Sequence, residues 1–177
     1  MTDIVRYVYL DGQRVEVPAG EVFAHIAPRL IATGNAPPRN QNGGTNTTPV
    51  PGEIHLAELF VPLGVNAAGI ALFNGGAVGG NVTLGLYDGY GVLLGQSAST
   101  PQAGTEVYQR VPLPLRLGPG SYYVAAQFSS AAARFRTHAF GNFGAGKIVG
   151  QPYGTLPLVM APSTTFAPGL GPMASLY

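Results

Sequence analysis

Two stretches in which apolar residues alternate with small or polar ones constrain the fold of this chain more than any other feature. They are residues 81–94 (NVTLGLYDGYGVLL) and 117–128 (LGPGSYYVAAQF). A period of two residues is typical of a strand with one buried face. Each stretch contains a turn, at 88–91 and 118–120, with the Gly, Pro and Asp residues that reverse antiparallel strands. The residues predicted to face a shared core are Val82, Leu84, Leu86, Tyr122, Val124, Ala126 and Phe128.

Further strand-like segments follow at intervals of about ten residues, bounded by turn-forming residues. The predicted strands lie near residues 53–61, 67–73, 80–87, 91–97, 105–111, 121–129, 133–140 and 155–160. Eight short strands at this spacing are typical of a jelly roll. The predicted fold class is therefore all-β, an antiparallel β-sandwich of jelly-roll type.

The N-terminal third has a different character. Residues 4–10 and 13–17 flank Asp11-Gly12, the pair that most strongly favours a tight β-hairpin. Residues 34–52 are rich in Pro, Gly and Asn and almost free of apolar side chains, which is typical of a linker or an extended arm. The predicted organisation is an N-terminal hairpin or anchor at 1–33, an arm or linker at 34–52 and a jelly-roll sandwich at 53–177.

Charged residues make up only 10% of the chain, against about a quarter in ordinary soluble domains. Such a surface is poorly soluble unless other subunits cover it, so we expect a homo-oligomer, with a trimer favoured. The net charge of +1 argues against nucleic acid or an anionic membrane as a partner. Cysteine is absent, which excludes disulfides and thiolate metal sites, and the sequence shows no signal peptide and no apolar run long enough to span a membrane.

The two alternating stretches, LGLYDGYGVLLGQS and LGPGSYYVAAQF, together with the closing YGTLPLVMAPSTTFAPGLGPMASLY, resemble the small jelly-roll domains of tailed-bacteriophage virion proteins. Such domains occur in head decoration proteins, spikes and tail fibres. The resemblance covers residues 53–177 and implies a structural or binding role without choosing a ligand.

Motifs for catalysis or cofactor binding are weak. Residues 141–147 match the spacing of a phosphate-binding loop, but Ile148 replaces the hydroxyl residue that holds magnesium, and no helix can begin there. Glu53 and His55 share one face of a predicted strand, and with His25 or His138 they would make an incomplete zinc site. We therefore predict no enzyme activity, no cofactor and no metal.

Two groups of residues are candidates for binding partners. Arg134, Arg136 and His138 alternate along one strand and predict a cationic contact stripe for a protein partner, to which Arg39 in the arm is added. Tyr87, Tyr90 and Tyr108 are candidates for stacking on sugar rings, although tyrosine is also a common residue of strands and interfaces.

These features together predict a non-enzymatic structural protein of a phage-like particle, made in the host cytoplasm and located in the virion. The preferred role is a capsid decoration or cement protein that stabilises neighbouring subunits of the major capsid protein, or binds another virion protein. The alternative is a receptor-binding module of a tail fibre or spike that recognises a host glycan through its tyrosines.

Overall fold

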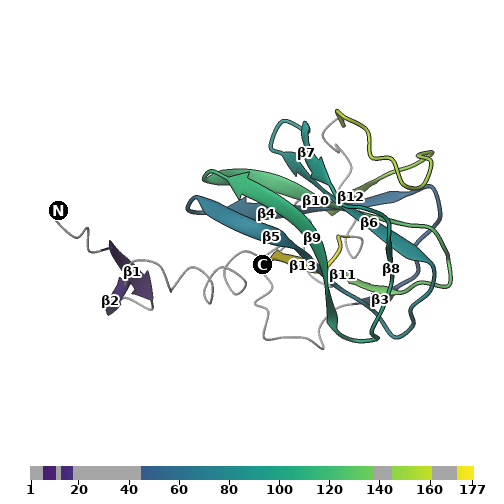
Figure 1. The fold of residues 1–177 in the computed structure, drawn as a ribbon, viewed down its shortest axis with the longest axis horizontal. Helices are drawn as coiled ribbons and strands as arrows, with labels where there is room; N and C mark the ends of the chain where they lie inside the picture. The colour runs from purple at the N-terminus through teal and green to yellow at the C-terminus, as the bar shows by residue number, and fades with distance from the viewer. Residues whose placement is uncertain (1–5, 11–12, 18–44, 138–144, 161–170) are drawn as a thin grey trace.

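The computed structural model describes residues 6–10, 13–17, 45–137, 145–160 and 171–177. These residues contain thirteen strands and no helix (Figure 1). The strands are β1 (Arg6–Leu10), β2 (Gln13–Val17), β3 (Thr45–Thr47), β4 (Ile54–Val61), β5 (Val65–Phe73), β6 (Asn81–Asp88), β7 (Leu93–Gln96), β8 (Thr100–Pro101), β9 (Tyr108–Leu117), β10 (Gly120–Phe128), β11 (Phe135–Thr137), β12 (Ala145–Ile148) and β13 (Ala174–Leu176).

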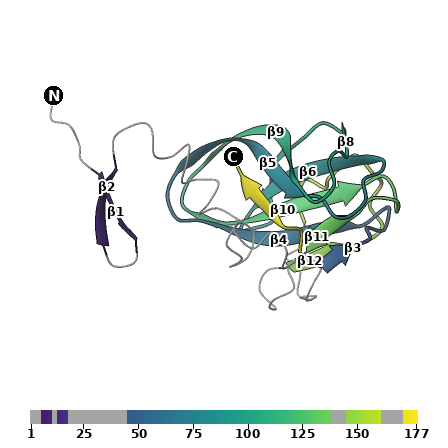
Figure 2. The same cartoon turned by 90° about the horizontal axis from the view of Figure 1, so that it is seen from below.

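Two antiparallel sheets pack face to face. The larger sheet has the order β12-β4-β10-β6-β7, with β8 also pairing with β6, and the smaller sheet has the order β13-β5-β9. Figure 2 shows β5 and β9 along one side of the sandwich and β4 and β10 along the other. The predicted all-β antiparallel sandwich is confirmed.

The pair β3–β11 adds a third, short piece of sheet. Residue Asn74, just after β5, forms a bridge with Phe135 of β11, and Thr137 of β11 forms a bridge with Pro172. Strand β3 lies inside the segment 34–52, which the sequence predicts as an arm or linker, and residues 45–47 of that segment pair with β11. A three-residue strand without apolar side chains shows no hydrophobic period. Its pairing partner is also remote in sequence, so no local pattern predicts it.

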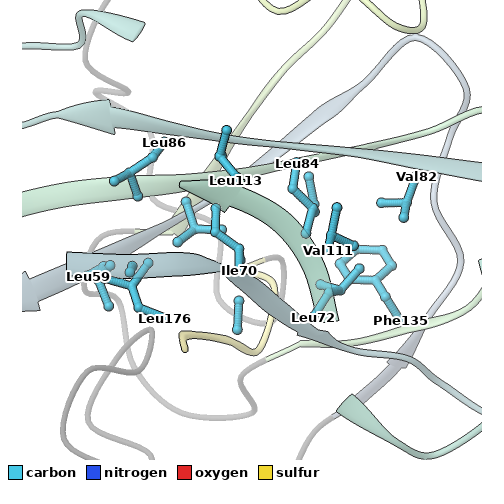
Figure 3. Close-up of a cluster of buried hydrophobic side chains, with 14 of the residues drawn as sticks. Leu59, Ile70, Leu72, Val82, Leu84, Leu86, Val111, Leu113, Phe135 and Leu176 are labelled. Carbon is cyan, nitrogen blue, oxygen red and sulfur yellow. The ribbon is translucent and has the colours of Figure 1, made fainter. Parts of the chain in front are cut away.

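The main core lies between the two sheets, and Figure 3 shows side chains from both converging there. The predicted inward face of β6 and β10 is confirmed, because six of its seven side chains are fully buried and Tyr122 packs partly buried against them. Ile70 and Leu72 of β5 and Val111 of β9 complete the cluster from the opposite sheet.

The outer face of the larger sheet is also covered. Residues 149–160, called here the covering segment, cross this face, and Leu156 and Met160 pack on Ile54, Leu56 and Tyr87 in a second apolar cluster. The sheet is therefore buried on both faces over its central strands, although its alternating sequence is typical of a sheet with one wet face.

Side-chain amides of the sheet hold the covering segment in place. Gln127 of β10 donates to the carbonyl of Pro152 over 3.0 Å and accepts from the amide of Gly154 over 2.9 Å. Gln96 of β7 accepts from the amide of Leu156 over 2.8 Å. These bonds give hydrogen-bond partners to irregular backbone that belongs to no strand.

Two strand predictions fail for identifiable reasons. Residues 155–160 contain a single bridge at Val159 and no strand, because the covering segment is bonded mainly to side chains. Strand β9 extends to Leu117, beyond the predicted end at 111, and passes through Pro112 and Pro114. Since β9 is the edge of its sheet, a proline there need not cost a bond to a neighbouring strand.

The predicted N-terminal hairpin is confirmed, with Leu10 opposite Gln13 across the Asp11-Gly12 pair. Its strands β1 and β2 pair only with each other among the described strands, and both apolar clusters consist entirely of residues after position 53.

Deletion of residues 1–44 is therefore expected to leave a folded sandwich. We expect the free energy of unfolding, measured by urea titration with circular dichroism, to change by less than about 1 kcal/mol, because no residue of either apolar cluster is lost. Deletion of 1–52 is the matched comparison, since it also removes β3, and should cost more stability. Loss of the cooperative transition in the shorter deletion would contradict this division of the chain.

Candidate interaction surface

The two predicted arginines of the cationic stripe are both bonded within the chain. The guanidinium of Arg134 donates to the backbone carbonyls of Ala131 and Ala133 over 2.9 and 2.7 Å. Arg136 donates from Nε and Nη2 to the two carboxylate oxygens of Glu106 over 3.0 and 2.8 Å. These bonds tie β11 to neighbouring loops, and a role of this pair in contacting a partner stays a prediction.

The other two members of that candidate interface, His138 and Arg39, lie outside the described residues. Their assignment stays a prediction.

The three candidate stacking tyrosines have different environments. Tyr87 is fully buried under the covering segment and donates to the carbonyl of Pro157 over 2.9 Å, and burial raises its pKa to about 12. Tyr108 is half-buried and stacks on Phe73 with ring centroids 4.8 Å apart, and burial raises its pKa as well. Tyr90, in contrast, is 86% exposed. The sugar-stacking prediction is therefore wrong for Tyr87, and of the three only Tyr90 presents a largely exposed ring.

A tight turn between β6 and β7 holds Tyr90 in this exposed position. The side-chain oxygen Oδ1 of Asp88 accepts from the amides of Tyr90 and Val92, each over 2.9 Å, and the Asp88 carbonyl accepts from Gly91 over 3.0 Å. Gly91 has a φ of +84°, and a Cβ there would collide with the carbonyl of Met160. Glycine is thus favoured at position 91, and the bonds to Asp88 fix the backbone that carries the Tyr90 ring.

Exposed apolar side chains surround this turn. Val92 forms an antiparallel bridge with Val159, the amide of Leu93 donates to the carbonyl of Leu158 over 2.9 Å, and the amide of Met160 donates to Gly91 over 2.9 Å. The group called here the Tyr90 surface comprises Tyr90, Val92, Leu94, Leu158 and Val159.

The Tyr90 surface is large and uncharged. Leu158 and Val159 are 77% and 67% exposed, and Val92 and Leu94 are each more than 40% exposed. Summed over the five side chains, the exposed area is on the order of 500 Å² and mostly apolar, and exposed apolar area of this size often marks a binding site on a soluble protein. Its nearest carboxylate in sequence, Asp88, is occupied by the turn. The arrangement fits an apolar partner surface rather than a charged ligand.

The sequence did not single out four of the five members of this surface. In the run 156–160 (LPLVM), every residue is apolar, yet Leu156 and Met160 are buried while Leu158 and Val159 are exposed. Hydropathy alone gives no signal for this division, because the covering segment follows neither the period of a strand nor that of a helix.

Of the weak motifs for chemistry, residues 141–144 of the loop-like motif and the two possible zinc partners His25 and His138 lie outside the described residues. Lys147 of the loop-like motif lies on β12 and forms an ion pair with Glu53, with Nζ 2.8 Å from Oε1. Within the described ranges, no group of three or more His, Asp and Glu residues is placed to hold a metal ion. The same ranges contain no helix long and apolar enough to cross a membrane.

Comparison of this chain with protein-family models, with curated proteins and with solved structures finds no match.

Proposed function

We propose that this chain is a non-enzymatic structural protein that docks on a larger protein assembly, in the manner of a decoration or cement protein of a phage-like particle. The observation that carries the proposal is the Tyr90 surface: an uncharged apolar patch at the edge of a sandwich, with an aromatic residue held out by a braced turn. Aromatic residues on such patches are the common anchors of protein interfaces.

The rigidity of the turn favours binding. Tyr90 is fixed at its backbone by the bonds to Asp88, so little main-chain freedom is lost when a partner covers the ring. A braced aromatic side chain therefore contributes more of its buried area to affinity than one on a loose loop.

The size of the patch favours several copies acting together. A partner in a standard interface contributes about 800 Å², more than the roughly 500 Å² that the Tyr90 surface offers. A single copy would thus bind weakly, while a symmetric oligomer, for which we favour a trimer, would engage several sites on the particle and gain avidity. Binding only to the assembled shell would then stabilise that shell by mass action.

Substitution within the Tyr90 surface is expected to weaken attachment without unfolding the protein. Tyr90→Ala and Val159→Asp should each weaken co-sedimentation with the parent particles at least tenfold, because hot-spot losses typically exceed about 1.4 kcal/mol. Val107→Asp is the matched control, since it places the same charge on a valine that is 48% exposed elsewhere. Equal co-sedimentation of all three variants and the unmodified protein would refute the proposal.

A glycan-binding module of a tail fibre or spike is the second candidate, and the exposed ring of Tyr90 is the observation that favours it. Sugar stacking needs the ring alone, whereas protein docking needs the surrounding apolar side chains. Calorimetric titration with host-surface oligosaccharides distinguishes the two roles. Saturable binding that Tyr90→Ala removes and Val159→Asp retains would favour the glycan module.

A further inference from the structure

His55 occupies an unusual position for a titratable side chain. It lies on β4, opposite Ala126 of β10 and Lys147 of β12, and is only 2% exposed. Its ring centroid is 4.8 Å from that of Phe135 and 6.4 Å from that of Phe128. The imidazole is thus packed as an aromatic core residue at the end of the sandwich where β4, β11 and β12 meet.

Neither ring nitrogen of His55 has a hydrogen-bond partner among the described residues. A neutral imidazole has one donor and one acceptor, so both are buried at a cost that a phenylalanine would not incur. Burial is also the main reason why the pKa of His55 is lowered from 6.5 to about 4.

The charged groups around His55 do not provide a free acceptor for its protonated form. The negative charge of Glu53 raises the pKa of His55, but less than burial lowers it, and the Glu53 carboxylate is held by Lys147, with Oε1 2.8 Å from Nζ. The positive charge of Lys147 lowers the pKa of His55 further. On β11, Arg136 alternates away from Phe135 and pairs with Glu106, and the β10 residues beside the ring, Ala126 and Phe128, are uncharged. A proton on His55 would therefore leave a buried, poorly compensated charge.

We propose that His55 is an acid-sensitive latch, whose protonation opens the edge strand β12 while the rest of the larger sheet stays paired. Strand β12 is the element best placed to yield, because it has four residues and pairs only with β4 among the described strands. Strand β10, on the other side of β4, is nine residues long and is held between β4 and β6. His55 lies opposite Lys147 of β12, so separation of β12 from β4 would expose the imidazole to water.

The direction of the effect follows from the lowered pKa. The closed state binds the proton less tightly than an open state in which His55 regains its ordinary value of 6.5. The closed state is therefore fully favoured above pH 6.5 and loses that advantage as the pH falls towards 4. A difference of about 2.5 pKa units raises the opening equilibrium constant by up to roughly 300-fold.

Hydrogen exchange of the full chain tests the latch. Between pH 7 and pH 4.5, and after correction for intrinsic exchange rates, amides of 145–148 and 54–57 should lose at least tenfold in protection, while those of 82–86 on β6 change little. The variant His55→Phe keeps the ring packing without the titratable nitrogens, and its protection at 145–148 should not depend on pH in this range. His55→Met is the second variant, in case the phenylalanine does not fit.

Two results would overturn the latch. One is equal loss of protection in the unmodified protein and a folded His55 variant, which would assign the effect to carboxylates. The other is simultaneous loss at β12 and β6, which would mean global unfolding rather than opening of the edge.

Discussion

Removal of residues 171–177 is expected to unfold the sandwich at 25 °C. These residues carry β13, which pairs with β5, and they place Leu176 and Met173 in or beside the core at 0% and 5% exposure. Loss of a buried Leu or Met side chain costs about 2–5 kcal/mol each, and a domain of this size is stable by only about 5–15 kcal/mol. Seven terminal residues thus contribute a large share of the total stability.

Backbone bonds add to this effect. The carbonyl of Tyr177 accepts from the amides of Ala68 and Gly69 at the bulge in β5, over 2.6 and 3.3 Å, and Phe73 donates to Met173 over 2.9 Å. Truncation leaves these donors without partners in the middle of a sheet, at a further cost of about 1–3 kcal/mol for each one that water does not reach.

The control for this truncation is Tyr177→Ala, which keeps the strand. The Tyr177 ring lies under the guanidinium of Arg110, 5.3 Å from the ring centroid, an interaction worth about 0.5–1 kcal/mol at a partly exposed site. We expect a cooperative urea transition in Tyr177→Ala and none in the truncated chain. A truncated chain with an unchanged transition midpoint would show that β13 is dispensable.

Asn74→Ala is expected to cost about 3–4 kcal/mol, the second largest effect, because this fully buried amide joins two loops. Its Nδ2 donates to the carbonyls of Ala103 and Gly104 over 2.7 and 2.9 Å, and lies 3.0 Å from Oε1 of Gln109. Its Oδ1 accepts from Gln102 over 3.0 Å. Alanine would leave several of these groups buried without a partner.

Gln102 extends the same network. It also donates to the carbonyl of Arg134 over 2.7 Å and accepts from the amide of Gly79 over 3.0 Å, so the loops 74–80 and 98–107 are held together by two amide side chains. In such networks the loss of one member also weakens the bonds of the others.

Asn66→Ala is the matched control for Asn74→Ala. Asn66 is an exposed asparagine on β5, the strand that Asn74 directly follows, so its loss should change the free energy of unfolding by less than about 0.5 kcal/mol. Urea unfolding of both variants provides the measurement. Similar small losses for both would mean that water replaces the Asn74 bonds and that the network adds little.

Local pattern was sufficient for the strands that carry the main core. Val82, Leu84 and Leu86 alternate strictly, and a one-residue shift would expose all three, so the sequence alone identified their buried face. The Asp11-Gly12 pair likewise predicted the hairpin, because this pair favours a tight turn between antiparallel strands, and β1 pairs with β2.

Strands that depend on distant partners escaped prediction. The residues of β13, Ala174–Leu176, are too few to show a period, and only their pairing with β5 makes them a strand. Strand β9 continues through Pro112 because it is the edge of its sheet, and edge position is a property of the assembled fold.

The sequence alone could not predict which of Tyr87 and Tyr90 is exposed at the candidate site. Both flank the same turn, and alternation correctly placed Tyr87 on the outer face of β6, opposite to Leu86. That face is nevertheless dry, because the covering segment 149–160 packs across it and leaves Tyr90 as the exposed ring. Strand alternation is a local property that the sequence determines, whereas the segment that covers a face comes from some seventy residues away and is decided only by tertiary packing.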